Sequence, residues 1–197
     1  LSRLALAVIA LLAACSPYYG RLDASLQRQV DQAMAARAAG DRNGACAILA
    51  EAVARSDHPA VLIQHGRCLT DAEGGAQDLA MARAAFERAY ALRSPLKGRA
   101  ALWLAIVERR SGGSAAAQVA WLERARELGE PGVERLLLKA WSDDPQTYRA
   151  ELLAAHERRA GSDPYSALEL ARLVAADPDA DPASRAARTA AAIRALE

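Results

Sequence analysis

Hydrophobic and polar positions alternate with helical spacing along most of the chain, and short polar breaks separate these stretches. From Ser25 onward, segments of about 12 to 18 residues carry small and aliphatic side chains three and four positions apart, the spacing of one helix face. The breaks contain glycine, aspartate and proline, which begin or end helices. They fall at 40–41, 57–59, 74–75, 94–95, 112–113, 129–132, 143–145, 161–164 and 177–182. This pattern predicts about ten helices joined by tight loops, which is typical of a solenoid.

The stretch 110–132 illustrates the pattern. Gly112 and Gly113 are predicted to end one helix, and Ser114 is predicted to cap the next one. The inner face of that second helix is predicted to consist of Val119, Leu122, Ala125 and Leu128.

A large residue followed three positions later by alanine recurs in the second helix of each predicted hairpin. The pairs are Leu49 with Ala52, Phe86 with Ala89, and Leu122 with Ala125, at spacings of 37 and 36 residues. The bulky side chain would fill the space between stacked helices, and the alanine would let their backbones approach closely. Because one hairpin cannot bury its apolar face alone, such units come in arrays.

One repeat resembles the Sel-one-like repeat, a slightly longer relative of the tetratricopeptide repeat. Its matching positions are Gly66, Leu69, Gly74, Asp78, Ala82, Phe86 and Ala89. The stretch 33–53 is similar to a plain tetratricopeptide hairpin, and 100–129 is intermediate between the two types. The resemblance implies an all-α fold, a right-handed α-solenoid of stacked helical hairpins. Repeats would occupy 25–160, degenerate after Gly132, and 161–197 would form C-terminal capping helices.

The amino-acid composition favours a helical fold and does not indicate a class of binding partner. Lys plus Arg number 25 against 24 Asp plus Glu, so no strong field exists to attract nucleic acid or an acidic polymer. Aromatic residues make up 5% of the chain, alanine is abundant, and isoleucine and valine are sparse, a balance that favours helices over sheets.

An apolar run begins at Leu4 and stops at a cysteine, Cys15. Its length of about eleven residues is too short for a membrane-spanning helix but fits the apolar region of a secretory signal. The last four residues, 12–15, resemble the lipobox of bacterial lipoproteins. The alternative is an ordinary secretory signal with a cysteine near its cleavage site.

The lipobox resemblance implies a division of the first part of the chain. Residues 1–14 would be a lipoprotein signal peptide, Cys15 would carry the acyl chains, and 15–24 would be the lipidated anchor and linker. Two or three acyl chains anchor a protein durably. In that family, a serine after the cysteine, here Ser16, rather than an aspartate, implies sorting to the outer membrane. The helical repeat domain would then occupy 25–197, about 180 residues, enough for one sizeable core, and two compact domains are also compatible.

Cys46 and Cys68 lie on helices that are predicted to be consecutive. Their α-carbons could therefore fall within the range of about 4.4 to 6.8 Å that a disulfide requires, in an oxidising compartment. Two small buried thiols are the equally weighted alternative. A metal site is disfavoured, because only His65 lies near either cysteine at ligand spacing.

No catalytic motif stands out in the sequence. His58, His65 and His156 are separated, and none lies in a metal-protease pattern or beside a serine nucleophile motif. Aspartates at helix boundaries are better explained as helix caps than as calcium ligands. We therefore expect no enzyme activity, no cofactor and no metal. The tryptophans Trp103, Trp121 and Trp141 could stack on sugar rings, but inter-helix packing is the favoured interpretation.

Together these features are similar to the repeat lipoproteins that act as scaffolds in bacterial exopolysaccharide (alginate) export. This resemblance implies a non-enzymatic periplasmic scaffold, anchored to the outer membrane, that binds an outer-membrane porin and periplasmic export components. The alternatives are a pilotin or outer-membrane protein assembly lipoprotein, and a protein that binds cell-wall glycan. Helix position alone suggests the partner surface, which would comprise Gln64, Arg67, Trp103 and Glu108.

Overall fold

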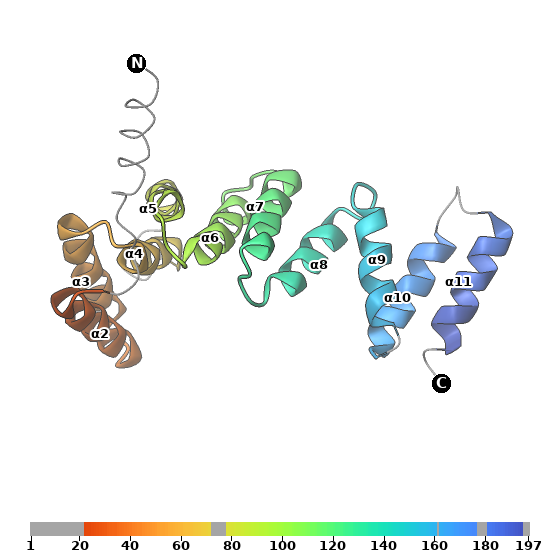
Figure 1. The fold of residues 1–197 in the computed structure, drawn as a ribbon, viewed down its shortest axis with the longest axis horizontal. Helices are drawn as coiled ribbons and strands as arrows, with labels where there is room; N and C mark the ends of the chain where they lie inside the picture. Colours follow the sequence, from red (N-terminus) through yellow and green to blue (C-terminus); the bar gives the residue numbers. More distant parts are fainter. Residues whose placement is uncertain (1–21, 72–77, 161, 177–180, 195–197) are drawn as a thin grey trace, which may run out of the picture. The chain divides into compact units, whose positions relative to one another are not determined.

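The computed structural model describes residues 22–71, 78–160, 162–176 and 181–194. Within these ranges the chain forms ten α-helices and no strand, which confirms the predicted all-helical class (Figure 1). The helices are α2 (Ala24–Ala38), α3 (Arg42–Arg55), α4 (Pro59–Asp71), α5 (Leu79–Ala91), α6 (Lys97–Arg110), α7 (Ala115–Glu127), α8 (Val133–Asp143), α9 (Arg149–Arg159), α10 (Pro164–Ala175) and α11 (Pro182–Arg194).

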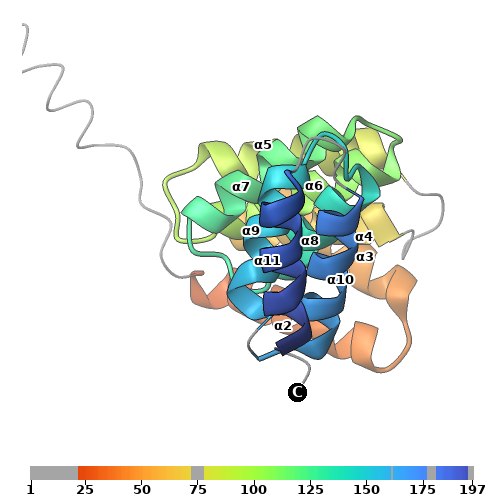
Figure 2. The same ribbon diagram turned by 90° about the vertical axis from the view of Figure 1, so that its right-hand side faces the viewer.

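The chain divides into two compact units, one ending at Val133 and the other beginning at Glu134. In the first unit, helices pack as neighbours in three hairpins, α2 with α3, α4 with α5, and α6 with α7. Successive hairpins also touch, through α3 with α4 and α5 with α6, and the first helices α4 and α6 lie against each other. In the second unit, α10 packs between α9 and α11, and Figure 2 shows α10 and α11 side by side.

Helix boundaries follow the local chemistry of the loops. Gly40, Gly112 and Gly129 adopt positive φ values of 88°, 72° and 74° just after helices, a conformation that glycine reaches without steric cost. Ser114 caps α7 as predicted, because its side chain accepts a hydrogen bond from the backbone N–H of Ala117 at 3.1 Å. The predicted break at 74–75 lies outside the described residues.

Aspartates cap several of the other helices. Asp41 Oδ1 accepts from the backbone N–H of Gly44, Asp78 Oδ1 from Met81, and Asp181 Oδ1 from Ser184, at 2.8, 2.8 and 2.9 Å. Asp143 does not cap a helix in this way; it forms an ion pair with Lys139 at 3.2 Å.

The large-residue and alanine pairs occupy the interior of the first unit. Leu49, Phe86 and Leu122, and the alanines three positions after each of them, are all at most 1% exposed. They lie on α3, α5 and α7, the second helix of each hairpin. One prediction on this face is wrong: Leu128 is 47% exposed, because α7 ends at Glu127 and Leu128 already belongs to the turn.

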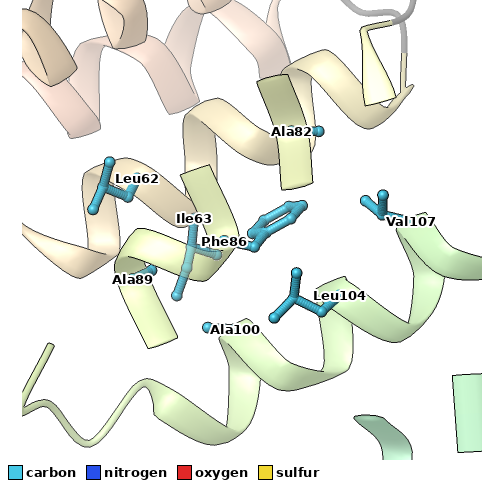
Figure 3. Packing of buried hydrophobic residues seen from close by; sticks show 8 residues of the cluster. All are labelled: Leu62, Ile63, Ala82, Phe86, Ala89, Ala100, Leu104 and Val107. Atoms are coloured by element: carbon cyan, nitrogen blue, oxygen red, sulfur yellow. The ribbon is translucent and has the colours of Figure 1, made fainter. Parts of the chain in front are cut away.

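The main buried cluster is formed by α4, α5 and α6. Figure 3 shows the Phe86 ring of α5 pointing toward the side chains of α4 and α6. The cluster consists of Leu62, Ile63, Ala82, Phe86, Ala89, Ala100, Leu104 and Val107. Two smaller clusters lie around Leu49 and Val61 in the same unit, and a separate one surrounds Leu170 in the second unit.

Candidate functional site

Three of the four predicted partner-surface residues come together on α4 and α6. Arg67 donates from Nη1 to Oε1 of Gln64 at 3.1 Å, one turn away on α4. The same guanidinium group lies 5.1 Å from the centre of the Trp103 ring on α6, within cation–π range. All three side chains are half-buried, so each also presents atoms to solvent. We call Gln64, Arg67 and Trp103 the α4–α6 surface.

The Trp103 indole is supported from inside the molecule. Its ring stacks on the Phe86 ring, with centroids 5.7 Å apart and an angle of 16° between the planes. Phe86 is fully buried and lies against Gly66. The α4–α6 surface is therefore built directly on the main buried cluster, which supports one side of the Trp103 ring.

Glu108 has a different role from the other three residues. Its carboxylate forms an ion pair with Arg83 of α5, and its side chain is only 14% exposed. It therefore links α5 to α6. A neighbouring link is made by Arg110, which donates to the backbone oxygen of Thr70 at 2.6 Å and pairs with Asp71 at 2.7 Å, at the C-terminal end of α4.

The other tryptophans are packed against internal partners. Trp121 is half-buried, meets Tyr90 edge-on with ring centroids 5.3 Å apart, and has the Arg124 guanidinium 4.5 Å from its ring centre. Trp141 is 3% exposed. Trp103 and Trp121 both pack on the outside of the main cluster, and each has an arginine side chain against its ring.

Cys46 of α3 and Cys68 of α4 form a disulfide, with α-carbons 5.8 Å apart. The pair lines a cavity of about 280 Å³ together with Asn43, Ala47, Ala50, His65 and Leu69. Burial lowers the pKa of His65, so its ring is neutral at neutral pH.

The histidines do not gather into a site. His58 is buried at the start of α4, where its Nδ1 accepts from the backbone N–H of Ala60 at 3.2 Å. In the part of the chain that the structure describes, no group of three His, Cys, Asp or Glu residues could hold a metal ion.

The second unit contains a cavity that the sequence did not point to. It is bounded by α8, α9 and α10 and has charged residues and a buried histidine, His156, in its wall. The only sequence signal was the pair of basic residues one turn apart, Arg135 and Lys139, on a helix with a strongly apolar opposite face. Such pairs are common on solvated helix surfaces, and for that reason the pair does not by itself indicate a site.

Cys15, the predicted lipidation residue, and Gly74 of the repeat motif lie outside the described residues. Among the helices that are described, none is both long and apolar enough to cross a membrane.

Comparison with known proteins found no matching family model, no matching curated protein and no matching solved structure.

Proposed function

We propose that this protein is a non-enzymatic scaffold that binds other proteins through the α4–α6 surface. The observation that carries this proposal is the convergence of Gln64, Arg67 and Trp103 on two neighbouring helices. Arginine and tryptophan are the residue types that most often dominate the energy of protein interfaces. Because Phe86 already holds the indole, a partner would bind a largely preorganised surface.

The proposed architecture is an α-solenoid of tetratricopeptide and Sel-one-like hairpins. In the first unit, the second helices α3, α5 and α7 supply the fully buried large-residue and alanine pairs. The first helices α4 and α6 lie against each other and keep polar atoms accessible. A stack of hairpins of this kind presents its first helices as a continuous binding face.

The proposed location is the periplasmic face of the outer membrane, with acyl chains on Cys15. A disulfide between Cys46 and Cys68 favours an oxidising compartment, and this support is independent of the lipobox-like residues. The role in exopolysaccharide (alginate-like) secretion rests on the resemblance of the repeat motif and the lipobox to the export scaffold lipoproteins. It is the most specific part of the proposal.

The proposal is tested by crosslinking in the native membrane, followed by purification and mass spectrometry. The wild-type chain is compared with Cys15→Ala, which removes the anchor, and with Arg67→Glu and Trp103→Ala, which alter the α4–α6 surface. Arg42→Glu is the matched charge-reversal control, because Arg42 is exposed on α3. Circular dichroism shows whether each variant is folded.

We expect the wild type to recover a porin together with polysaccharide-synthesis proteins. The Arg67 and Trp103 variants should lose these partners, and Arg42→Glu should keep them. Recovery of a secretin or a barrel-assembly protein would instead indicate that this protein is a pilotin or assembly lipoprotein, and would contradict the export role. Recovery of glycan fragments without protein would overturn the scaffold proposal and indicate carbohydrate binding. If all folded surface variants recover the same amount of partner protein, the α4–α6 surface is not part of the interface.

A further inference from the structure

The cavity of the second unit is lined by residues of α8, of α9 and of the first half of α10. Its volume is about 340 Å³, at the small end of the range for ligand pockets. The lining residues that matter here are Arg135, Leu138 and Lys139 of α8, His156 of α9, and Tyr165 and Glu169 of α10.

Among the charged residues that line this cavity, the one without an ion-pair partner among the described residues is positive. Lys139 pairs with Asp143 at 3.2 Å, and Glu169 pairs with Arg172 at 2.8 Å. For Arg135, the described residues supply no ion-pair partner. A guanidinium group presents paired N–H donors that match the two oxygens of a carboxylate. The α8 side of the cavity is therefore suited to a carboxylate.

His156 provides a second, independent indication of a ligand. Its side chain is only 3% exposed, and its Nδ1 atom is buried without a hydrogen-bond partner among the described residues. Buried polar atoms are nearly always satisfied in native proteins, by protein groups or by water or ligand atoms. The His156 imidazole lies in the wall of the cavity, and its Nδ1 atom lacks a hydrogen bond. A polar ligand group in the cavity would be consistent with this.

The remaining lining groups have complementary chemistries. Leu138 and the ring of Tyr165 are apolar, and the Tyr165 side chain is 64% exposed at the rim of the cavity. The carboxylate of Glu169 can accept a hydrogen bond from an amide N–H. A carboxylate, an amide N–H and an apolar side chain are the three parts of the last residue of a peptide chain.

We infer that the cavity between α8 and α10 binds the C-terminal residue of a partner protein, with Arg135 on its carboxylate, Glu169 on its amide N–H, and Leu138 and Tyr165 around its apolar side chain. Capture of a free chain end is an established mode of peptide recognition. The inference rests on the proposed scaffold function in one respect, since the chain end would belong to a protein that the scaffold binds.

The test is a binding assay with defined peptides and the full chain in detergent. The probe is a pool of tetrapeptides, labelled with fluorescein at the N-terminus and ending in leucine with a free carboxylate. Fluorescence anisotropy should show saturable binding, at least about tenfold weaker for the same pool with a C-terminal carboxamide, because the charge-assisted hydrogen bonds are lost. Arg135→Gln should weaken binding of the free-acid pool to a similar extent. Arg158→Gln, an exposed arginine on α9, is the matched control and should bind like the wild type.

Three results would overturn the inference. The first is equal binding of the acid and amide pools, and the second is no saturable binding of either pool up to millimolar concentration. The third is displacement of the peptide by acetate or glucuronate at the same concentration as by unlabelled peptide, which would make the cavity a site for small acids. The assay does not involve the α4–α6 surface. A negative peptide assay would therefore not affect the crosslinking result for the α4–α6 surface. Loss of partners in the Arg67 variant would likewise not affect the peptide-binding result for the cavity.

Discussion

At the scale of single residues, Gly66 sets how closely α4 and α5 approach. A Cβ atom at this position would lie 2.7 Å from both Cε1 and Cζ of Phe86, closer than real Cβ contacts. The Phe86 ring cannot turn away freely, because it is fully buried and stacked on Trp103. One missing methyl group therefore positions the ring that supports the proposed binding surface.

Gly66→Ala tests this constraint. Alanine is a better helix former than glycine by about 1 kcal/mol, so in open space the substitution would stabilise α4. Overpacking of a buried site costs about 1–3 kcal/mol, and we expect this effect to win, lowering the free energy of unfolding by about 1 kcal/mol. Urea unfolding followed by circular dichroism measures the change. The double variant Gly66→Ala/Phe86→Leu, compared with Phe86→Leu alone, should show a smaller loss, and a more stable Gly66→Ala protein would contradict the interpretation.

His156 predicts a dependence of stability on pH. Burial lowers its pKa, Arg159 lowers it further, and Glu169 and Asp163 act in the opposite direction. The unfolded chain keeps the ordinary value of 6.5, so acidification adds a proton to the unfolded state first. The contribution of this group is therefore fully present above about pH 6.5 and is lost as the pH falls toward the folded pKa.

The measurement is urea unfolding between pH 7.5 and pH 5. The wild type should lose stability on acidification, and His156→Gln should reduce the slope of stability against pH, whatever its effect at pH 7.5. His65→Gln is the natural comparison, since burial also lowers the pKa of His65. An unchanged slope in the His156 variant would show that its ring is protonated equally easily in both states.

At the scale of helices, the first two hairpins are joined by packing and by a covalent bond. The contact between α3 and α4 is the smallest between helices that are consecutive in the chain of the first unit. The disulfide crosses this junction, and Cys68 belongs to the buried cluster around Leu49. The small contact between α3 and α4 and the disulfide that crosses it together indicate that the disulfide holds the α2–α3 hairpin in place.

Removing the disulfide with Cys46→Ala/Cys68→Ala should lower the free energy of unfolding by about 3 kcal/mol. This figure is the loop-closure entropy for cysteines separated by 22 residues. Unfolding curves with and without dithiothreitol measure the effect, together with a thiol titration. The reductant should destabilise the wild type and leave the double variant unchanged; insensitivity of the oxidised wild type would show that packing alone is sufficient.

Helix boundaries could be predicted from the sequence because glycine, aspartate and proline determine them locally. Ser114 and Asp78 cap helices for reasons contained in a few neighbouring residues. Helical periodicity predicts the wrong environment for Leu128 because it does not show where the last turn of α7 ends. In the candidate surface, Gln64, Arg67 and Trp103 contact one another, whereas helix position could not show that Glu108 forms an ion pair with Arg83 of another helix.

At the scale of the whole molecule, each described buried cluster lies within one of the two units. The repeats become degenerate after Gly132, next to the boundary, but the sequence did not identify a boundary there, because the glycine-containing break at 129–132 resembles the breaks within each unit. It also missed the α8–α10 cavity, since the residues that line it come from three helices and share no motif.

Separate clusters predict separate unfolding. A chain limited to residues 22–133 should fold alone, and the full chain should show two thermal transitions by calorimetry. Dithiothreitol should shift only the transition of the first unit, which contains the disulfide. A single transition that shifts as a whole would show that the units unfold as one.

The disulfide also determines how the chain carries tension. When a protein is pulled by its two ends, force passes along the shortest covalent route, and a crosslink excludes the enclosed segment from that route. Here the route runs from Cys46 directly to Cys68. Residues 47–67, which include Gln64 and Arg67, are thus shielded from stretching. A protein tethered at its N-terminal end and pulled at its C-terminal end would keep this half of the proposed binding surface intact under load.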